Sequence, residues 1–180
     1  AGLVCVAGVS ANGGVNAHKP CGIQHSDLAT LARGACVHWA PMGSNSKLVS
    51  WTCRLLAQDT NCKIVIAYSD TDAGEIGTIY QACNWVCIGR GSATNQWVAP
   101  NGRIYDQKLP YDLARRTDFR NKRADSTKAL RGAGWQEQAS NPKYRDVNVL
   151  YKSDKALSAR VAYRQPPPQK RAKSIISVSP

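Results

Sequence analysis

The stretch of sequence that most constrains the fold runs from Lys63 to Gly89. It begins with KIVIAY, an apolar run of strand length, and ends with a second such run, WVCIG. Polar residues 69–73 connect the first run to a short predicted helix, whose apolar residues are Ile76, Ile79, Tyr80 and Cys83. The pattern predicts a strand–helix–strand unit, with Tyr80 buried where the helix meets the strands.

A similar unit precedes this stretch. The run ACVHWA, residues 35–40, is continuous and apolar, as in strands that are buried on both faces. A helix is predicted after it, and the apolar face of that helix contains Leu48, Trp51 or Thr52, Leu55 and Leu56. The return from this helix to KIVIAY makes a crossover, which by the handedness rule is right-handed and joins parallel strands.

The turn between that strand and that helix has the composition of an anion site. Its residues are Met42, Gly43, Ser44, Asn45, Ser46 and Lys47. Glycine permits unusual backbone angles, serine and asparagine cap helices, and the unpaired N–H groups at a helix start favour negative charge. The same residues also suit a plain helix cap, so the turn alone leaves both interpretations open.

The second half of the chain has shorter and more polar signals. Asn101-Gly102 predicts a hairpin turn between two short strands. A charged segment after Asp106 predicts helical turns that end at residues 132–134, and KYRDVNVLY, residues 143–151, predicts an edge strand. The prolines at 166–168 predict a stiff, solvated exit from the domain.

Length and composition favour one intracellular globular domain. The 180 residues are 43% hydrophobic, and no apolar run approaches the about 18 residues of a membrane span. The apolar start lacks a signal-peptide pattern and begins directly on a strand-like segment, so we expect further residues upstream of Ala1. Seven cysteines without a regular framework predict reduced thiols, among them Cys36, Cys53, Cys83 and Cys87. His18, Cys21 and His25 lack a fourth ligand at zinc-site spacing.

Charge divides the chain into two parts. Residues 1–101 carry six Lys and Arg against five Asp and Glu, whereas residues 102–180 carry eighteen against seven. Such a concentration of cations favours a polyanionic partner such as nucleic acid, although a solvated basic tail has the same composition. We therefore predict a core over 1–101, a basic, DNA-facing part of the same domain over 102–165, and a Pro-rich basic tail over 166–180. The residues predicted to contact DNA are Arg103, Arg115, Arg116, Arg120, Lys122, Arg123, Lys143 and Arg145.

The central stretch resembles the Mom DNA-modification proteins of bacteriophages, within the GNAT acetyltransferase superfamily. The matching positions are Tyr68, Asp70, Gly74, Gly77, Thr78, Ile79, Tyr80, Gln81, Ala82, Asn84, Trp85 and Gly89. Weaker similarity extends to Ser46, to NPKYRDV at 141–147 and to PPPQKR at 166–171. The resemblance covers most of the chain, but only the central stretch is distinctive.

The resemblance implies a fold and a cofactor. The fold is α/β (α+β): a GNAT-like mixed, mostly antiparallel sheet with a central splayed pair of parallel strands, flanking helices and a basic C-terminal extension. It implies an acyl-CoA such as acetyl-CoA between the splayed strands, with its pyrophosphate at residues 42–47. It also implies that Tyr80 protonates the departing thiolate, whereas packing against Trp85 is the alternative role for this residue.

The resemblance further implies an enzyme that adds a small acyl-derived, carbamoylmethyl-like group to adenine N6 of double-stranded DNA, which protects the DNA from restriction. Ser69, Asp70 and Glu75 would supply the polar site beside the acyl carbon. Plain transfer from acetyl-CoA gives a different product, and the family has been linked to a bound iron, so the metal stays open. The implied location is the cytoplasm of a bacterial host.

The sequence departs from the family pattern at several positions. The family histidine is Glu75 here, the asparagine expected at the cofactor turn is Gly43, and an expected arginine is Thr30. A family His-Tyr pair would lie before Ala1. Two alternatives therefore remain: an N-acetyltransferase acting on a protein or small-molecule amine, and a non-catalytic DNA- or virion-associated protein with the same fold.

Overall fold

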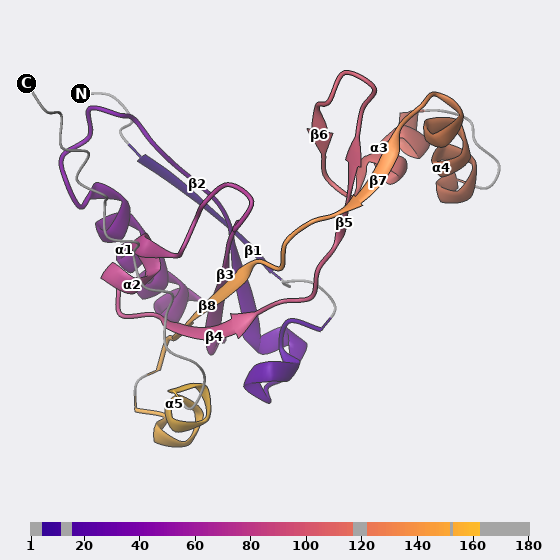
Figure 1. The fold of residues 1–180 in the computed structure, drawn as a ribbon. Coiled ribbons are helices and arrows are strands. Elements are labelled where there is room, and N and C mark those ends of the chain that lie inside the picture. The colour runs from indigo at the N-terminus through magenta and orange to yellow at the C-terminus, as the bar shows by residue number, and fades with distance from the viewer. Residues whose placement is uncertain (1–4, 12–15, 117–121, 152, 163–180) are drawn as a thin grey trace, which may run out of the picture. The chain divides into compact units, whose positions relative to one another are not determined.

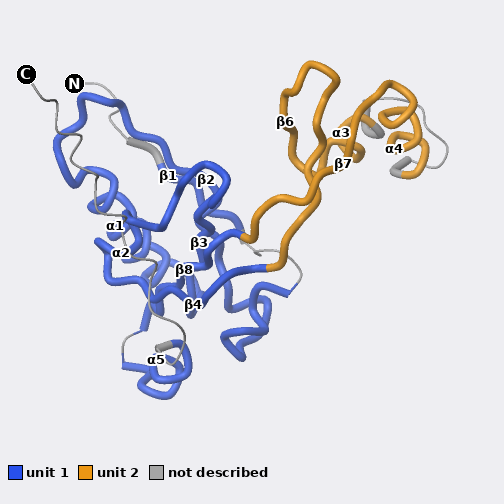
Figure 2. The backbone as a smooth tube through the Cα atoms, in the orientation of Figure 1, with its two compact units in different colours: residues 1–91, 143–180 blue, residues 92–142 orange. Residues whose placement is uncertain are grey.

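The computed structural model describes residues 5–11, 16–116, 122–151 and 153–162. Its chain forms two compact units (Figure 2): unit 1 contains residues 1–91 and 143–180, and unit 2 contains residues 92–142. Unit 2 is thus an insertion within unit 1. The division predicted at residues 101 and 165 follows the distribution of charge and not the compactness of the chain, and it stays a prediction.

Unit 1 is built on a five-stranded sheet with the order β1-β2-β3-β8-β4 (Figure 1). The strands are β1 (Cys5–Ala11), β2 (Leu28–Cys36), β3 (Ile64–Ser69), β4 (Val86–Arg90) and β8 (Tyr144–Val149). β2 and β3 are parallel, while the β1–β2, β3–β8 and β4–β8 pairs are antiparallel. The predicted mixed, mostly antiparallel sheet with flanking helices is therefore confirmed, as is the parallel crossover.

The parallel pair separates soon after it begins. Residues 28–30 of β2 pair with residues 64–66 of β3, and the register ends there. Beyond Thr30, β2 continues to Cys36 and pairs only with β1. Leu28 to Leu31 are buried, whereas most of the following residues are exposed, as expected for a strand that has left its neighbour. The sheet thus opens between β2 and β3 at Thr30.

Helices cover both faces of this sheet, because β3 alternates strictly between them. Val65 and Ala67 pack in a cluster with Val49 and Cys53 of α1 (Ser44–Asp59), which α2 (Thr78–Ala82) joins through Tyr80. Ile64 and Ile66 pack instead with Leu157 and Val161 of α5 (Lys155–Ala162). Two short 3-10 helices, η1 (Lys19–Cys21) and η2 (His25–Asp27), precede β2. Every residue from Ile64 to Ala67 is fully buried as a result.

Three details of the sequence-based prediction are wrong. The strand predicted at residues 35–40 lies earlier, because the chain pairs from Leu28 and turns after Cys36, which leaves Trp39 exposed. The buried face of α1 is Val49 and Cys53, so Trp51 points to solvent. A helix offers two apolar faces here, and the sheet covers the one with smaller residues. Residues 143–151 form no edge strand, since β8 lies between β3 and β4.

Five of the seven cysteines follow the prediction of reduced thiols. Cys21, Cys53, Cys62, Cys83 and Cys87 form no disulfide bond. Cys36 is disulfide-bonded, which contradicts the prediction for that residue, and the residue opposite it in the β1–β2 ladder is Cys5. Directly opposed positions on antiparallel strands bring Cβ atoms close enough for such a bond, which a sequence count of cysteines does not reveal.

Unit 2 has its own three-stranded sheet and two helices. The sheet has the order β6-β5-β7, with β5 (Asn95–Val98), β6 (Ile104–Tyr105) and β7 (Gln136–Ala139), and the helices are α3 (Leu109–Arg116) and α4 (Lys122–Gly132). The predicted hairpin at Asn101-Gly102 is confirmed, with Gly102 at a φ of 80°. Trp97 is the large buried side chain at its centre. Among the described residues of either unit, no helix combines the length and hydropathy needed to cross a membrane.

Candidate functional site

The central feature of unit 1 is a buried carboxyl group, Asp146, in the middle of β8. Only 1% of the residue is exposed, and its Oδ2 accepts a hydrogen bond of 3.2 Å from the Ser69 hydroxyl. Its Oδ1 has no hydrogen-bond partner among the described residues. Burial raises the pKa of Asp146 to about 6, against the lowering effect of the Ser69 bond. This carboxyl group therefore changes its protonation close to neutral pH, as groups that exchange protons with a substrate do.

Helix α2 begins directly against this carboxyl group. Its N-cap, Gly77, has a φ of 74°, and a Cβ atom there would lie 2.6 Å from Asp146 Oδ2 and 3.1 Å from the Ser69 hydroxyl. Both the backbone angle and the close approach require glycine at this position. The Gly77 of the central motif thus lets the start of α2 pack onto the Ser69–Asp146 pair.

Tyr80 lies one turn further along α2, on the face of the sheet that α1 covers. Its ring is half-buried and contacts the Trp85 ring at a centroid distance of 5.1 Å. Burial, followed by the negative charges of Glu75 and Asp146, raises the pKa of Tyr80. The phenol therefore stays protonated at neutral pH and can donate a proton to an anionic leaving atom. The packing contact with Trp85, the alternative role for this residue, is therefore present in the structure.

Asp70 and Glu75 lie in the polar crossing between β3 and α2, and hydrogen bonds join them. The Asp70 N–H donates to the Glu75 carboxylate at 2.7 Å, and the Glu75 N–H donates to the Asp70 carbonyl at 2.9 Å. Lys143 forms an ion pair with Asp70 at 2.6 Å, which holds the pKa of Asp70 below its usual range. Both carboxylates thus stabilise the conformation of this crossing. Their predicted part in the chemistry stays a prediction.

The predicted anion turn lies at the N-terminus of α1. Gly43 caps this helix in a left-handed conformation with a φ of 82°, and no side chain caps it. The Ser44 and Ser46 hydroxyls donate to the carbonyls of Pro41 and Gly43, so neither accepts a bond from the helix start. Within the described part of the chain, the N–H groups of Asn45 and Ser46 make no hydrogen bond. Met42 is fully exposed and Lys47 is exposed, so the turn is open to a ligand.

Three further polar atoms of unit 1 are buried without a hydrogen-bond partner among the described residues: Thr30 Oγ1, His18 Nδ1 and Arg145 Nε. Thr30 lies where β2 and β3 separate. The His18 and His25 rings contact each other at 5.3 Å. The described residues contain no group of three or more His, Cys, Asp or Glu placed to hold a metal ion. Thr30 is therefore the unpaired group that lies closest in the sheet to the opening.

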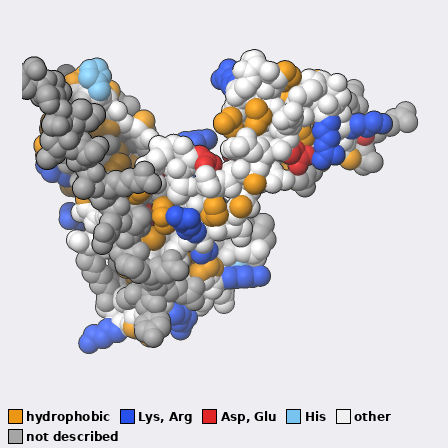
Figure 3. All heavy atoms as spheres, in the orientation of Figure 1, with side chains coloured by type: hydrophobic (Ala, Val, Ile, Leu, Met, Phe, Trp, Pro, Cys, Tyr) orange, Lys and Arg blue, Asp and Glu red, His pale blue; other side chains and the backbone are white. Residues whose placement is uncertain are grey.

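The basic residues predicted to contact DNA divide over the two units. Lys143 and Arg145 are in unit 1, where Arg145 donates to the Arg90 carbonyl at 2.8 Å. Arg103 is in unit 2 and lies over the Tyr105 ring. Of the others, Arg115 and Arg116 are in α3, Lys122 and Arg123 are in α4, and Arg120 lies outside the described residues. Lys and Arg side chains are visible on the surface of both units (Figure 3).

Sequence reasoning missed Asp146 and Arg90. Arg90 donates to the Tyr144 hydroxyl at 2.8 Å and stacks on its ring at 4.9 Å, beside the Lys143–Asp70 ion pair. A signal for Asp146 exists in the sequence, because it directly precedes Val147 in a strand whose apolar residues alternate. An edge strand would place that aspartate in solvent, so the wrong strand position concealed it.

The comparisons with known proteins give one result. No curated protein matches the chain. The model of the Mom protein family matches residues 3–169, which covers both units and every residue of the site described above. The chain therefore belongs to the Mom protein family.

Proposed function

We propose that this protein is an acyltransferase-like enzyme of the GNAT type that modifies adenine N6 in double-stranded DNA. The Mom family associates the chain with phage DNA modification. The observation that carries the chemical proposal is the hydrogen-bonded pair Ser69–Asp146 together with Tyr80. They lie on the face of the sheet that α1 and α2 cover, just beyond the last paired residues of β2 and β3. On this face Asp146 can accept a proton and Tyr80 can donate one.

The sheet order supports the GNAT part of the proposal. A parallel pair that splays, a helix starting at the open end of the first strand, and a third strand inserted antiparallel next to the second are the features expected of that fold. In such an arrangement the cofactor is an acyl-CoA such as acetyl-CoA. The free N–H groups of Asn45 and Ser46 fit its pyrophosphate, because a helix N-terminus without a side-chain cap favours an anion.

The residues then have separate tasks in acyl transfer. Asp146 accepts a proton from the adenine amino group as its nitrogen bonds to the acyl carbon, and Ser69 orients the carboxylate. The carbon–sulfur bond of the thioester breaks, and Tyr80 donates its proton to the departing sulfur. Gly77 keeps the start of α2 close enough for both residues to serve one substrate.

This assignment covers acyl transfer alone. A carbamoylmethyl-like product differs from a simple amide, so the finished modification requires chemistry beyond these residues. The described residues offer no metal-binding group, and no step is assigned to iron. The basic side chains of both units supply the attraction to DNA through counterion release.

The test is the modification of DNA that is co-expressed with the full-length protein. Digestion to nucleosides and mass spectrometry should show an adenine of increased mass, and Tyr80→Phe should abolish it while the protein remains folded. The matched control is Tyr68→Phe, because Tyr68 is also half-buried with a raised pKa but packs on the opposite face of the sheet. Unmodified adenine with the natural protein would overturn the proposal. Equal loss in both variants would overturn the role of Tyr80.

A non-catalytic DNA-associated protein is the second candidate function. The observation that favours it is Glu75, which stands where the family has histidine and whose carboxylate is occupied by the Asp70 N–H. This candidate predicts salt-dependent DNA binding with no stabilisation of the protein by CoA. Turnover of acetyl-CoA on free amines without DNA affinity would instead indicate an ordinary N-acetyltransferase.

A further inference from the structure

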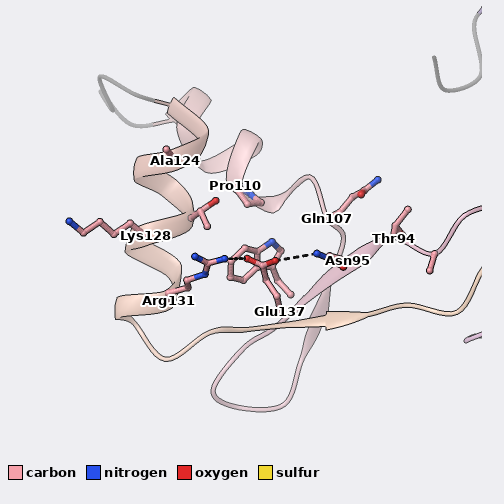
Figure 4. Close-up of a pocket in the computed structure, with 11 residues that line it drawn as sticks. Thr94, Asn95, Gln107, Pro110, Ala124, Lys128, Arg131 and Glu137 are labelled. Carbon is pink, nitrogen blue, oxygen red and sulfur yellow. Dashed lines mark hydrogen bonds and ion pairs between the residues drawn. The ribbon is translucent and has the colours of Figure 1, made fainter. Parts of the chain in front are cut away.

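Unit 2 contains a hollow of about 960 Å³ that plays no part in the site of unit 1. It lies between the face of the small sheet and helix α4, and every residue that lines it belongs to the insertion (Figure 4). Its volume lies at the upper end of the range for sites that hold small organic molecules. The hollow is therefore large enough for a planar heterocycle with its sugar.

The floor of the hollow is apolar, and its wall carries a fixed polar chain. Trp97 and Pro110 are buried beneath it. On the wall, Glu137 Oε1 accepts from the Arg131 guanidinium at 2.7 Å, and Glu137 Oε2 accepts from the Asn95 amide at 3.2 Å. Figure 4 shows the three side chains in line across the hollow. Trp97 and Glu137 are opposite each other in the β5–β7 ladder, so the ring and the carboxylate share one face.

The charges in the hollow argue against a phosphate group as its ligand. The Arg131 cation is neutralised by Glu137, and Lys128, which lines the hollow, extends away from the Glu137 and Asn95 side chains in Figure 4. What remains is one carboxylate with spare lone pairs, the free carbonyl of Asn95, and an aromatic floor. These groups fit a neutral ring that donates hydrogen bonds from an amino group, because carboxylates and amides bind the exocyclic amino groups of cytosine and adenine.

We infer that this hollow binds an unpaired adenine or cytosine base of the DNA, separate from the adenine that is modified at unit 1. The inference rests on the proposed function for its choice of nucleic acid. The surrounding insertion carries nine Lys and Arg against five Asp and Glu, which favours a phosphate backbone around the hollow. A paired base cannot enter a concave site, so the base leaves the stack and lies against Trp97. Glu137 and Asn95 then contact its amino edge.

The test is equilibrium binding of labelled duplexes that carry one unpaired residue. The full-length protein should bind duplexes with an unpaired adenine or cytosine about tenfold more tightly than duplexes with an unpaired thymine or an abasic residue. Asn95→Ala and Glu137→Gln should each remove most of this preference. Asn95→Ala should leave the dependence on salt concentration unchanged, and Glu137→Gln, which leaves the Arg131 cation unpaired, should not lower it. The matched control is Gln138→Ala, because Gln138 neighbours Glu137 on β7 but lies on the other face of the strand.

The outcomes separate this inference from the proposed function. Equal binding of base-containing and abasic duplexes would overturn the hollow as a base site, even if adenine is modified. A preference that survives both variants would place base binding elsewhere and overturn it as well. A preference lost in both variants, in a protein that modifies no adenine, would support the base site and overturn the proposed enzyme. Circular dichroism of each variant shows whether it is folded.

Discussion

The substitution Asp146→Asn is expected to stabilise the protein at neutral pH while it abolishes modification. Asparagine has almost the same shape as aspartate and still accepts the Ser69 hydrogen bond, but it carries no charge to bury. In the natural protein, the carboxylate form of this buried group is disfavoured, which is why its pKa rises to about 6. The substitution removes that unfavourable term.

The size of the effect follows from the pKa. The shift from 3.8 to about 6 corresponds to about 3 kcal/mol between the two protonation states. Because the folded pKa is the higher one, the folded protein binds the proton more tightly, and its free energy of unfolding falls as the pH rises from about 4 to about 6. The Asn variant lacks this fall. The difference between the two proteins should therefore be small near pH 4 and reach at most about 3 kcal/mol above pH 7.

Urea unfolding of both proteins at several pH values between 4 and 8, at constant ionic strength, measures this difference. Asp59→Asn provides the matched control for the loss of one formal charge, since Asp59 is exposed at the end of α1. A difference that does not change with pH would refute the assignment of a titration near 6 to Asp146. A variant that is less stable than the natural protein at pH 7.5 would refute the burial argument itself. Modification of DNA, measured on the same samples, should be lost.

Three further predictions concern the same site. Gly77→Ala should destabilise the protein by about 1–3 kcal/mol, since a positive φ is combined with contacts to Asp146. Gly74→Ala, which has the same φ but open space around it, should cost only about 1 kcal/mol in the same unfolding assay. Lys143→Gln should change the free energy of unfolding by less than about 1 kcal/mol, because the ion pair is partly exposed, and should lower the salt dependence of DNA binding by about one unit of slope. Glu75→Ala should loosen the crossing and lower Tm by a few degrees, and an unchanged Tm would show that its hydrogen bond contributes nothing.

Prediction from the sequence succeeded where the neighbouring residues along the chain determine the local structure. The strand at Lys63–Tyr68, the short helix around Tyr80 and the hairpin at Asn101-Gly102 were all predicted correctly. Each combines a clear hydrophobic period with a turn residue that has a specific backbone requirement. Asn84, which follows this short helix, has a positive φ of 59°.

The prediction failed where long-range pairing decides the structure. Nothing local distinguishes the edge strand expected at residues 143–151 from the central strand that forms, since only the positions of β3 and β4 make it central. The central position of β8 buries Asp146 and so makes it part of the candidate site. The extent of β2 was missed in the same way, because Leu28 to Thr30 are strand residues through their pairing with β3. Apolar residues further on, such as Trp39, are left exposed.

The attachment of the insertion to unit 1 has a consequence for how this family could diversify. β4 and β8 are antiparallel neighbours, and the Gly91 N–H donates to the Lys143 carbonyl at 2.8 Å, so the chain leaves and re-enters the sheet at adjoining points. In topological terms residues 92–142 are the loop of a β-hairpin. A tight two-residue turn could close the same hairpin without changing the register of either strand. Inserted segments of different structure could thus be exchanged at this junction while the five-stranded sheet of unit 1 keeps its geometry.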